Sequence, residues 1–441
     1  MKPIFEKMVL FLLLALPFGA RAQENAFSVD ADYLTRGEIR DGGLSVSEDG
    51  QANSARFVLG RTRLGASYTK SWLTARLTAQ HAGTWGSSEG SNLSMYEAWV
   101  QMRSPKGFFA QVGRQSLSYD DQRIFGSDDW SMTGMSHDGL KLGFERWGHK
   151  IHLFGAYNQD VDNIDEGGTR FSGGVQPYKS LASVWYHYDI PKTHIGASLL
   201  WARLGMQSEI KMAEEEAEPD PEADKTFFQQ IAGAFLSWNP AWFSLEAAYY
   251  HQWGAEQNGI PLNAWMASAK ATATPSDRWS FRAGYDYLSG EEDFATPPEG
   301  QIGLVRHEIV RGFNSLYGSR HKFYGAMDFF YVQTYVNGFT PGLQNLYAGI
   351  TWSPIKPLSL DAAYHFLSTA APVEDAKNAL GHEVELNASW QITEKVSLSA
   401  GYSFMQGTET MEILKRSSNK NRLQWAWLML QVTPTFFSGK W

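Results

Sequence analysis

The sequence predicts an all-β fold, a transmembrane antiparallel β-barrel of about 18 strands in the outer membrane of a Gram-negative cell. Three observations predict it: an N-terminal export signal, runs of alternating apolar and polar residues, and connections that alternate between short and long. The composition agrees. A chain of 441 residues with 17 Trp, 19 Tyr and 26 Phe but only 19% charged residues is typical of a barrel with aromatic girdles.

The export signal covers residues 1–22. Two lysines flank the start of an apolar run over residues 8–18, and Ala20 and Ala22 supply the small residues that a signal peptidase needs. The apolar run is shorter than the roughly 20 residues of a membrane-spanning helix. We therefore expect a cleaved signal peptide and one barrel domain over residues 23–441. Because the sequence contains no Cys, we expect neither a lipoprotein anchor nor a thiolate metal site.

Strand periodicity is clearest in residues 73–80. Apolar and polar side chains alternate there without interruption, which places Leu73 and Leu77 on one face of a strand and Arg76 and Gln80 on the other. The same alternation recurs in three further runs, residues 279–288, 358–366 and 396–404. A strand with one apolar and one polar face suits a barrel wall between lipid and a water-filled lumen.

The connections between predicted strands alternate in length. Short periplasmic turns and long extracellular loops are the expected asymmetry of an outer-membrane barrel. The barrel must also close, because an open sheet edge would leave backbone polar groups unpaired in lipid. The short connections centre on residues 69–70, 104–106, 147–149, 191–192, 239–240, 274–277, 354–355 and 393–394, and the long ones on 41–53, 118–137, 158–179, 205–226, 289–341, 369–379 and 407–420.

The segment 317–332 decides the strand count. Counting every β-like run gives an odd total, whereas a single-chain bacterial barrel has an even number of strands with both termini on one side. We therefore assign this segment to a loop. Its apolar residues need burial, so we expect it to fold over or into the barrel mouth as a lid or constriction, with His321, Lys322 and Asp328 facing the solute path. The apolar residues are Phe323, Met327, Phe329, Phe330 and Val332.

The predicted inward faces carry charges of both signs. Such a lining differs from the single-sign field that would steer an anionic polymer. Two interpretations stay open: the charges pair across strands and solvate the lumen, or several arginines form a selectivity constriction. The inward basic residues are Arg61, Arg63, Arg76, Lys141, Lys270 and Arg282, and the inward acidic residues are Glu97, Glu145, Glu246, Asp286, Asp361, Glu383 and Glu385.

Other function classes find little support in the sequence. The net charge of −9 argues against nucleic-acid binding, which requires a basic surface. No nucleophile elbow, HExxH helix or Gly-rich phosphate loop is present, so we expect no enzyme, no cofactor and no metal site. Two acidic runs, residues 158–168 and 214–224, are open to two interpretations, divalent-cation binding beside lipopolysaccharide or solvated loops. The expected surroundings are outer-membrane lipid and lipopolysaccharide.

Two segments resemble the alginate-export porin family. The first is Gly113-Arg114-Gln115, followed by Tyr119-Asp120-Asp121-Gln122-Arg123-Ile124-Phe125-Gly126 and then His137-Asp138. The second is Tyr317-Gly318-Ser319-Arg320-His321-Lys322-Phe323-Tyr324-Gly325 with Asp328. The resemblance implies an outer-membrane channel that exports an anionic polysaccharide such as alginate, with periplasmic export components as partners. The alternative is a passive uptake porin for oligosaccharides or small organic anions.

The first segment also has two interpretations. Arg114 and Arg123 can pair with Asp120, Asp121 or Asp138 and hold a folded loop, or they can offer fork-shaped donors to carboxylates and sugar hydroxyls at a constriction. Both interpretations can hold together. The constriction candidates are Arg61, Arg63, Arg76, Arg114, Arg123, Lys141 and Arg282. The loop motif comprises Tyr119, Asp120, Asp121, Gln122, Asp138, His321, Lys322 and Asp328.

Overall fold

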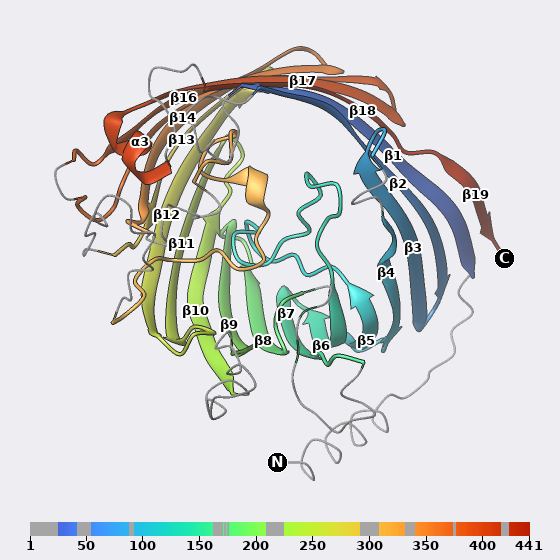
Figure 1. The fold of residues 1–441 in the computed structure, drawn as a ribbon. Helices are drawn as coiled ribbons and strands as arrows, with labels where there is room; N and C mark the ends of the chain where they lie inside the picture. Colours follow the sequence, from blue (N-terminus) through green and yellow to red (C-terminus); the bar gives the residue numbers. More distant parts are fainter. Residues whose placement is uncertain are drawn as a thin grey trace.

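One antiparallel sheet curls into a barrel in which consecutive strands from β1 to β18 pair with each other (Figure 1). The computed structural model describes residues 25–41, 54–87, 92–161, 171, 173, 176–208, 225–291, 308–330, 340–373, 376–415 and 423–441. The predicted signal peptide, most of both acidic runs and Val332 lie outside these residues. The strands are β1 (Ala26–Asp41), β2 (Ser54–Lys70), β3 (Leu73–Thr84), β4 (Asn92–Arg103), β5 (Phe108–Gln115), β6 (His137–Arg146), β7 (His149–Tyr157), β8 (Ser180–Ile190), β9 (Ile195–Gln207), β10 (Thr226–Trp238), β11 (Phe243–Ala255), β12 (Pro261–Ser276), β13 (Trp279–Leu288), β14 (Leu343–Ile355), β15 (Leu358–Ser368), β16 (Ala379–Thr393), β17 (Val396–Gly407), β18 (Leu423–Val432) and β19 (Thr435–Lys440).

The barrel closes where the first strand meets the last two. β1 pairs with β2 on one edge and with β18 and then β19 on the other. β18 and β19 follow each other along β1 and are separated by a break at Pro434, whose carbonyl accepts a hydrogen bond from the Ala31 N–H at 3.0 Å. The predicted barrel of about 18 strands is therefore confirmed, with β19 as an extra strand that continues the line of β18.

The alternation predicted from the sequence appears as an apolar outer face and a polar inner face. Leu77 and Phe281 are exposed on the outside, whereas Thr78 and Asp286 are buried on the inside. Strands of this kind need no apolar run of helical length, because consecutive side chains point to opposite faces. The described residues contain no helix long and apolar enough to cross a membrane.

The connections follow the predicted asymmetry. At one end of the barrel the turns are two to four residues long. Trp147 and Gly148 between β6 and β7 both have positive φ, 56° and 81°, as a tight two-residue hairpin requires. The register pairs Ala26 with Lys440 at this same end, so both ends of the barrel sequence lie on the side of the short turns, as predicted. At the other end, the loop 408–422 contains a short helix, α3 (Glu409–Lys415).

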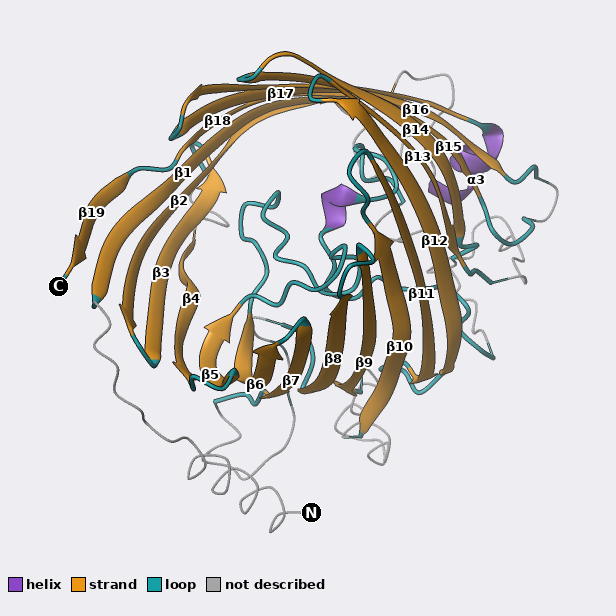
Figure 2. Cartoon of the chain, turned by 180° about the vertical axis from the view of Figure 1, so that it is seen from behind, coloured by secondary structure: helices purple, strands orange, loops and turns teal. Residues whose placement is uncertain are grey.

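Two long connections turn into the barrel interior. The loop 116–136 and the part of the β13–β14 connection described over 308–330 run across the inside of the ring (Figure 1, Figure 2). They form one hydrophobic cluster with inward side chains of β7 to β18. The predicted burial of the segment 317–330 is confirmed: Phe329 and Phe330 are 4% and 0% exposed. Part of the barrel lumen is therefore filled by a packed core.

Candidate functional site

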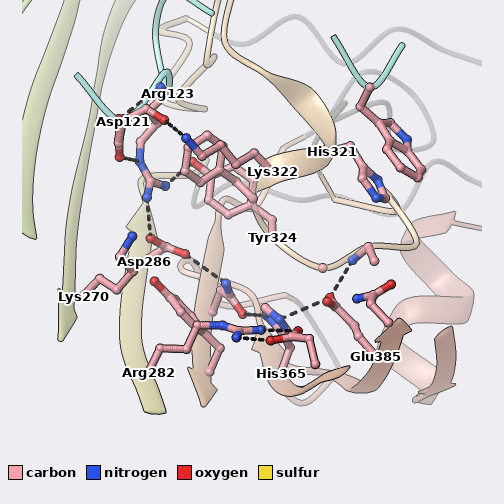
Figure 3. A pocket seen from close by; sticks show the side chains of 18 of the residues that line it. Asp121, Arg123, Lys270, Arg282, Asp286, His321, Lys322, Tyr324, His365 and Glu385 are labelled. Atoms are coloured by element: carbon pink, nitrogen blue, oxygen red, sulfur yellow. Dashed lines mark hydrogen bonds and ion pairs between the residues drawn. The ribbon is translucent and has the colours of Figure 1, made fainter. Parts of the chain in front are cut away.

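Arg123 joins the two inward loops to the barrel wall. Its guanidinium contacts the Asp121 carboxylate in its own loop and the Asp286 carboxylate of β13, each at 3.1 Å. It also donates a hydrogen bond to the Tyr324 hydroxyl at 2.9 Å (Figure 3) and lies over the ring of Phe323. Burial alone lowers the pKa of Arg123, but Tyr324, Asp286 and Asp121 outweigh burial and raise the pKa well above its ordinary value. The side chain is thus a fixed cation.

The remaining residues of the first motif hold the loop 116–136 against the wall. The ring of Tyr119 stacks on Trp185 of β8 with centroids 4.6 Å apart. The Asp120 carboxylate accepts a hydrogen bond from the Trp185 indole at 3.1 Å. Asp120 and Gln122 have positive φ, 53° and 69°, a conformation that Asp and Asn tolerate better than most residues. Burial raises the pKa of Asp120 above its ordinary range. These contacts fix the loop.

The second motif packs directly on the first. The Ser319 hydroxyl donates to Gln122 at 2.8 Å, and the Arg320 N–H donates to the Asp128 carboxylate at 3.1 Å. The second motif is also bound to the barrel wall, because two acidic residues of β16 accept hydrogen bonds from consecutive backbone N–H groups that follow the motif. Glu385 takes the Ala326 N–H and Glu383 the Met327 N–H, each at 2.8 Å. The two motifs are therefore held between opposite parts of the wall.

A stack of aromatic rings closes the contact between the loops. Trp130 of the first loop lies 4.1 Å from His321 of the second, with the ring planes 10° apart. His321 also contacts the Asp328 carboxylate at 3.1 Å. The Arg36 guanidinium of β1 also lies 4.1 Å from the Trp130 ring centroid. The tip of the first loop thereby reaches the wall near the barrel seam.

Three of the predicted constriction residues face inward but are held by acidic partners. Arg61 pairs with Asp32 at 2.7 Å and Arg63 with Asp129 at 2.8 Å. Arg61 also donates to the Asp129 carbonyl at 2.9 Å, so the loop tip covers both arginines. Arg76 contacts Asp30 with both terminal nitrogens, at 2.6 and 2.8 Å. On this side of the lumen the cations are neutralised.

Arg114 has a different position from the one expected for a pore-lining residue. Its register partners are Ala98 and Asp138, and it shares a face of β5 with Val112, which is 55% exposed on the outside. There it forms a two-pronged ion pair with Asp138, at 2.8 and 2.6 Å. The pair predicted for loop fixation is present, but it lies on the outer face, away from the lumen.

The open part of the lumen is a cavity of about 830 Å³ between the second loop and the inner faces of β10 to β18 (Figure 3). Two wall cations line it, and each is paired: Lys270 with Glu246 at 2.6 Å and Arg282 with Asp361 at 2.5 and 2.8 Å. Lys141 lies on the inward face of β6 beside Gln111 and is not part of this lining. Neutral polar side chains from the wall supply the rest of the lining near the short turns: Ser237, Asn239, Ser268, Ser359, Asn387, Ser389 and Ser399.

Comparison with known proteins gives the fold. No protein-family model and no curated protein matches the chain. Solved structures with the same fold include Pseudomonas aeruginosa OccK3 (OpdO), with a TM-score of 0.60, 10% identity and coverage of 93% of this chain and 96% of that one. A BenF-like porin from Pseudomonas fluorescens Pf-5 has a TM-score of 0.59, 12% identity and coverage of 93% and 99%. P. aeruginosa OccK2 (OpdF), solved in complex with glucuronate, has a TM-score of 0.59, 11% identity and coverage of 93% and 98%.

These neighbours correct the family resemblance. The likeness to alginate-export porins is wrong, because the structures that share this barrel over nearly its whole length are those of the OccK, Opd and BenF-like porins. The physical reason lies in the two motifs. Their residues position loops through Arg123, Gln122 and Ser319, and loop fixation carries no information about a transported polymer. The fold is that of porin channels, and its apolar outer face and closed ladder locate the chain in the outer membrane.

Proposed function

We propose that this chain is an outer-membrane porin for the passive uptake of small organic anions or short saccharides. The observation that carries the proposal is the narrowing of an 18-stranded lumen by two folded loops. A barrel of this size leaves an aqueous channel when its interior is empty. Here the loops leave a cavity of about 830 Å³, within the range of about 300–1,000 Å³ that suits small-molecule ligands.

The lining of the cavity supports the solute class. Serine and asparagine side chains offer donors and acceptors to sugar hydroxyls, and the rings of Phe323, Tyr347 and Trp427 lie among them. The complex of OccK2 (OpdF) with glucuronate shows that a barrel of this fold can accept a hydroxylated organic acid. Arg123 is paired with two carboxylates and holds in place the two loops that narrow the lumen.

Liposome swelling tests the proposal. Purified protein in liposomes should admit glucose and gluconate, and the swelling rate should fall as the saccharide becomes longer. Ser268→Trp places a large ring in the cavity from β12 and should lower both rates severalfold. Ala267→Trp is the matched control, because the neighbouring residue of the same strand faces outward, opposite Tyr249.

Three results would contradict the proposal. The first is wild-type liposomes that admit neither solute at a rate above protein-free liposomes. The second is equal swelling for Ser268→Trp and wild type, which would place the path outside the cavity. Passage of a long polyuronate chain would likewise show that the loops do not set the size limit.

A further inference from the structure

Lys322 is unlike the other basic residues of the cavity. The lining contains four lysines and arginines: Arg123, Lys270, Arg282 and Lys322. The first three contact carboxylates at 3.1 Å or less. Among the residues that the structure describes, Lys322 has no carboxylate within ion-pairing distance. Its side-chain nitrogen Nζ donates one hydrogen bond, to the Asp121 backbone carbonyl at 2.9 Å.

The position of Lys322 is fixed even though its side chain is exposed. It ends the short 3₁₀ turn η1 (Arg320–Lys322), whose preceding residue Ser319 is hydrogen-bonded to Gln122. The next residue, Phe323, packs on the guanidinium of Arg123. Of residues 320–330 only Arg320 and Lys322 are exposed, and of these two only Lys322 lines the cavity. The loop therefore presents this one ammonium group to the lumen.

We propose that Lys322 is the residue that binds the carboxylate of a permeating solute, which assigns hydroxylated monocarboxylates as the preferred class. This inference rests on the proposed uptake function. An ammonium group has three N–H donors, so two remain for the solute after the bond to Asp121. Paired cations contribute little net field, whereas an unpaired charge in a narrow lumen raises the local concentration of ions of opposite sign. Serine and asparagine side chains of the facing wall would take the hydroxyl groups.

The test compares gluconate with uncharged glucose in four variants. Lys322→Gln should lower gluconate swelling about tenfold, in line with electrostatic steering in clefts, and leave glucose swelling unchanged. Lys322→Glu should exclude gluconate further and turn the reversal potential in planar bilayers toward cations. Lys322→Arg should retain both properties. Lys356→Gln is the control of equal charge change, because Lys356 lies in the turn between β14 and β15.

Salt separates a charge effect from a structural one. The difference between wild type and Lys322→Gln should disappear at about 1 M salt, where charges more than about 3 Å apart are screened. An unchanged gluconate-to-glucose ratio in Lys322→Gln and Lys322→Glu would overturn the role of Lys322 while leaving the porin proposal intact. A wild-type protein that passes neither solute would instead overturn the proposed function itself.

Discussion

At the scale of single residues, ion pairing decides what the lumen presents to a solute. Arg61, Arg76 and Arg282 all face inward, yet each contacts a carboxylate at 2.8 Å or less. The mixed lining predicted from the sequence is therefore largely a set of neutral pairs. Partners such as Asp30 and Asp32 could have been predicted, because they alternate along β1 opposite the basic face of β2. The unpaired state of Lys322 could not, because it depends on how a distant loop folds.

Replacement of Arg123 should release both loops. Arg123→Ala leaves Asp121 and Asp286 without their cation inside the protein, a change that typically costs about 3–5 kcal/mol. We expect larger and noisier single-channel currents and a shift toward cation preference in planar bilayers, together with easier proteolysis within 116–136. Arg123→Lys keeps the positive charge but loses the planar guanidinium, so its currents and its protease resistance should lie between those of wild type and Arg123→Ala. Wild-type currents and protease resistance in Arg123→Ala would show that the loops are held without this residue.

The charge of Lys322 should make anion preference depend on pH. Partial burial of the Lys322 side chain in the cavity lowers its pKa, the cations Lys270 and Arg123 act in the same direction, and Asp121 and Glu246 act against them. A lysine is charged below its pKa, so the anion preference is complete at low pH and lost as the pH rises through that value. We expect the loss to begin below the ordinary lysine pKa of about 10.4. Reversal potentials measured from about pH 7 to about pH 10, just below the ordinary lysine pKa, follow this loss of anion preference. A pH dependence retained in Lys322→Gln would contradict the assignment.

At the scale of elements, the loops differ from the strands in how far sequence determines them. A strand between lipid and water must alternate, so residues 73–80 and the even strand count are enough to predict the barrel wall. The inner faces of β9 and β10 break this rule. Leu200, Leu204 and Ile231 are apolar and face inward, because they cover the loop 116–136. No local pattern identifies the segment that will pack on them.

Removal of the second loop tests whether it narrows the path. Leu288 of β13 pairs directly with Leu343 of β14, so deletion of residues 316–330 leaves every partner in the ladder. We expect an assembled barrel, recognised by heat-modifiable electrophoretic mobility, with a higher unit conductance. Replacement of residues 256–260, the connection between β11 and β12, by a two-residue turn serves as a control for loop shortening, because these residues lie outside the cavity lining. Failure to assemble would mean that the loop is needed for folding, and an unchanged conductance would place it outside the path.

At the scale of the whole molecule, the barrel is asymmetric. On the side of β7 to β9 the lumen is filled by a hydrophobic core that includes Phe125 and Tyr317. On the side of β10 to β18 the same core covers the end with the long loops, and nearer the short turns the lumen remains open as a charged cavity. The core gives the loops a rigid base, so one wall of the path is fixed by packing and the other by the strand ladder. Both depend on closure of the ring at the seam between β1 and the last two strands.

Truncation at the seam should prevent that closure. A chain that ends at Thr433 lacks β19, so residues Ala26 to Asp30 of β1 lose their partners along one edge while their pairing with β2 remains. Each backbone group left unpaired in lipid costs several kcal/mol. β18 pairs with β1 only from Tyr33 to Asp41, so it offers residues 26–30 no replacement partner. We expect the truncated chain to fail to reach the compact, heat-modifiable form in lipid vesicles without assembly factors. Phe437→Ala removes an outward side chain but keeps the ladder and should fold. If the truncated chain folds to the same protease-resistant barrel, β19 is dispensable and β18 alone closes the ring.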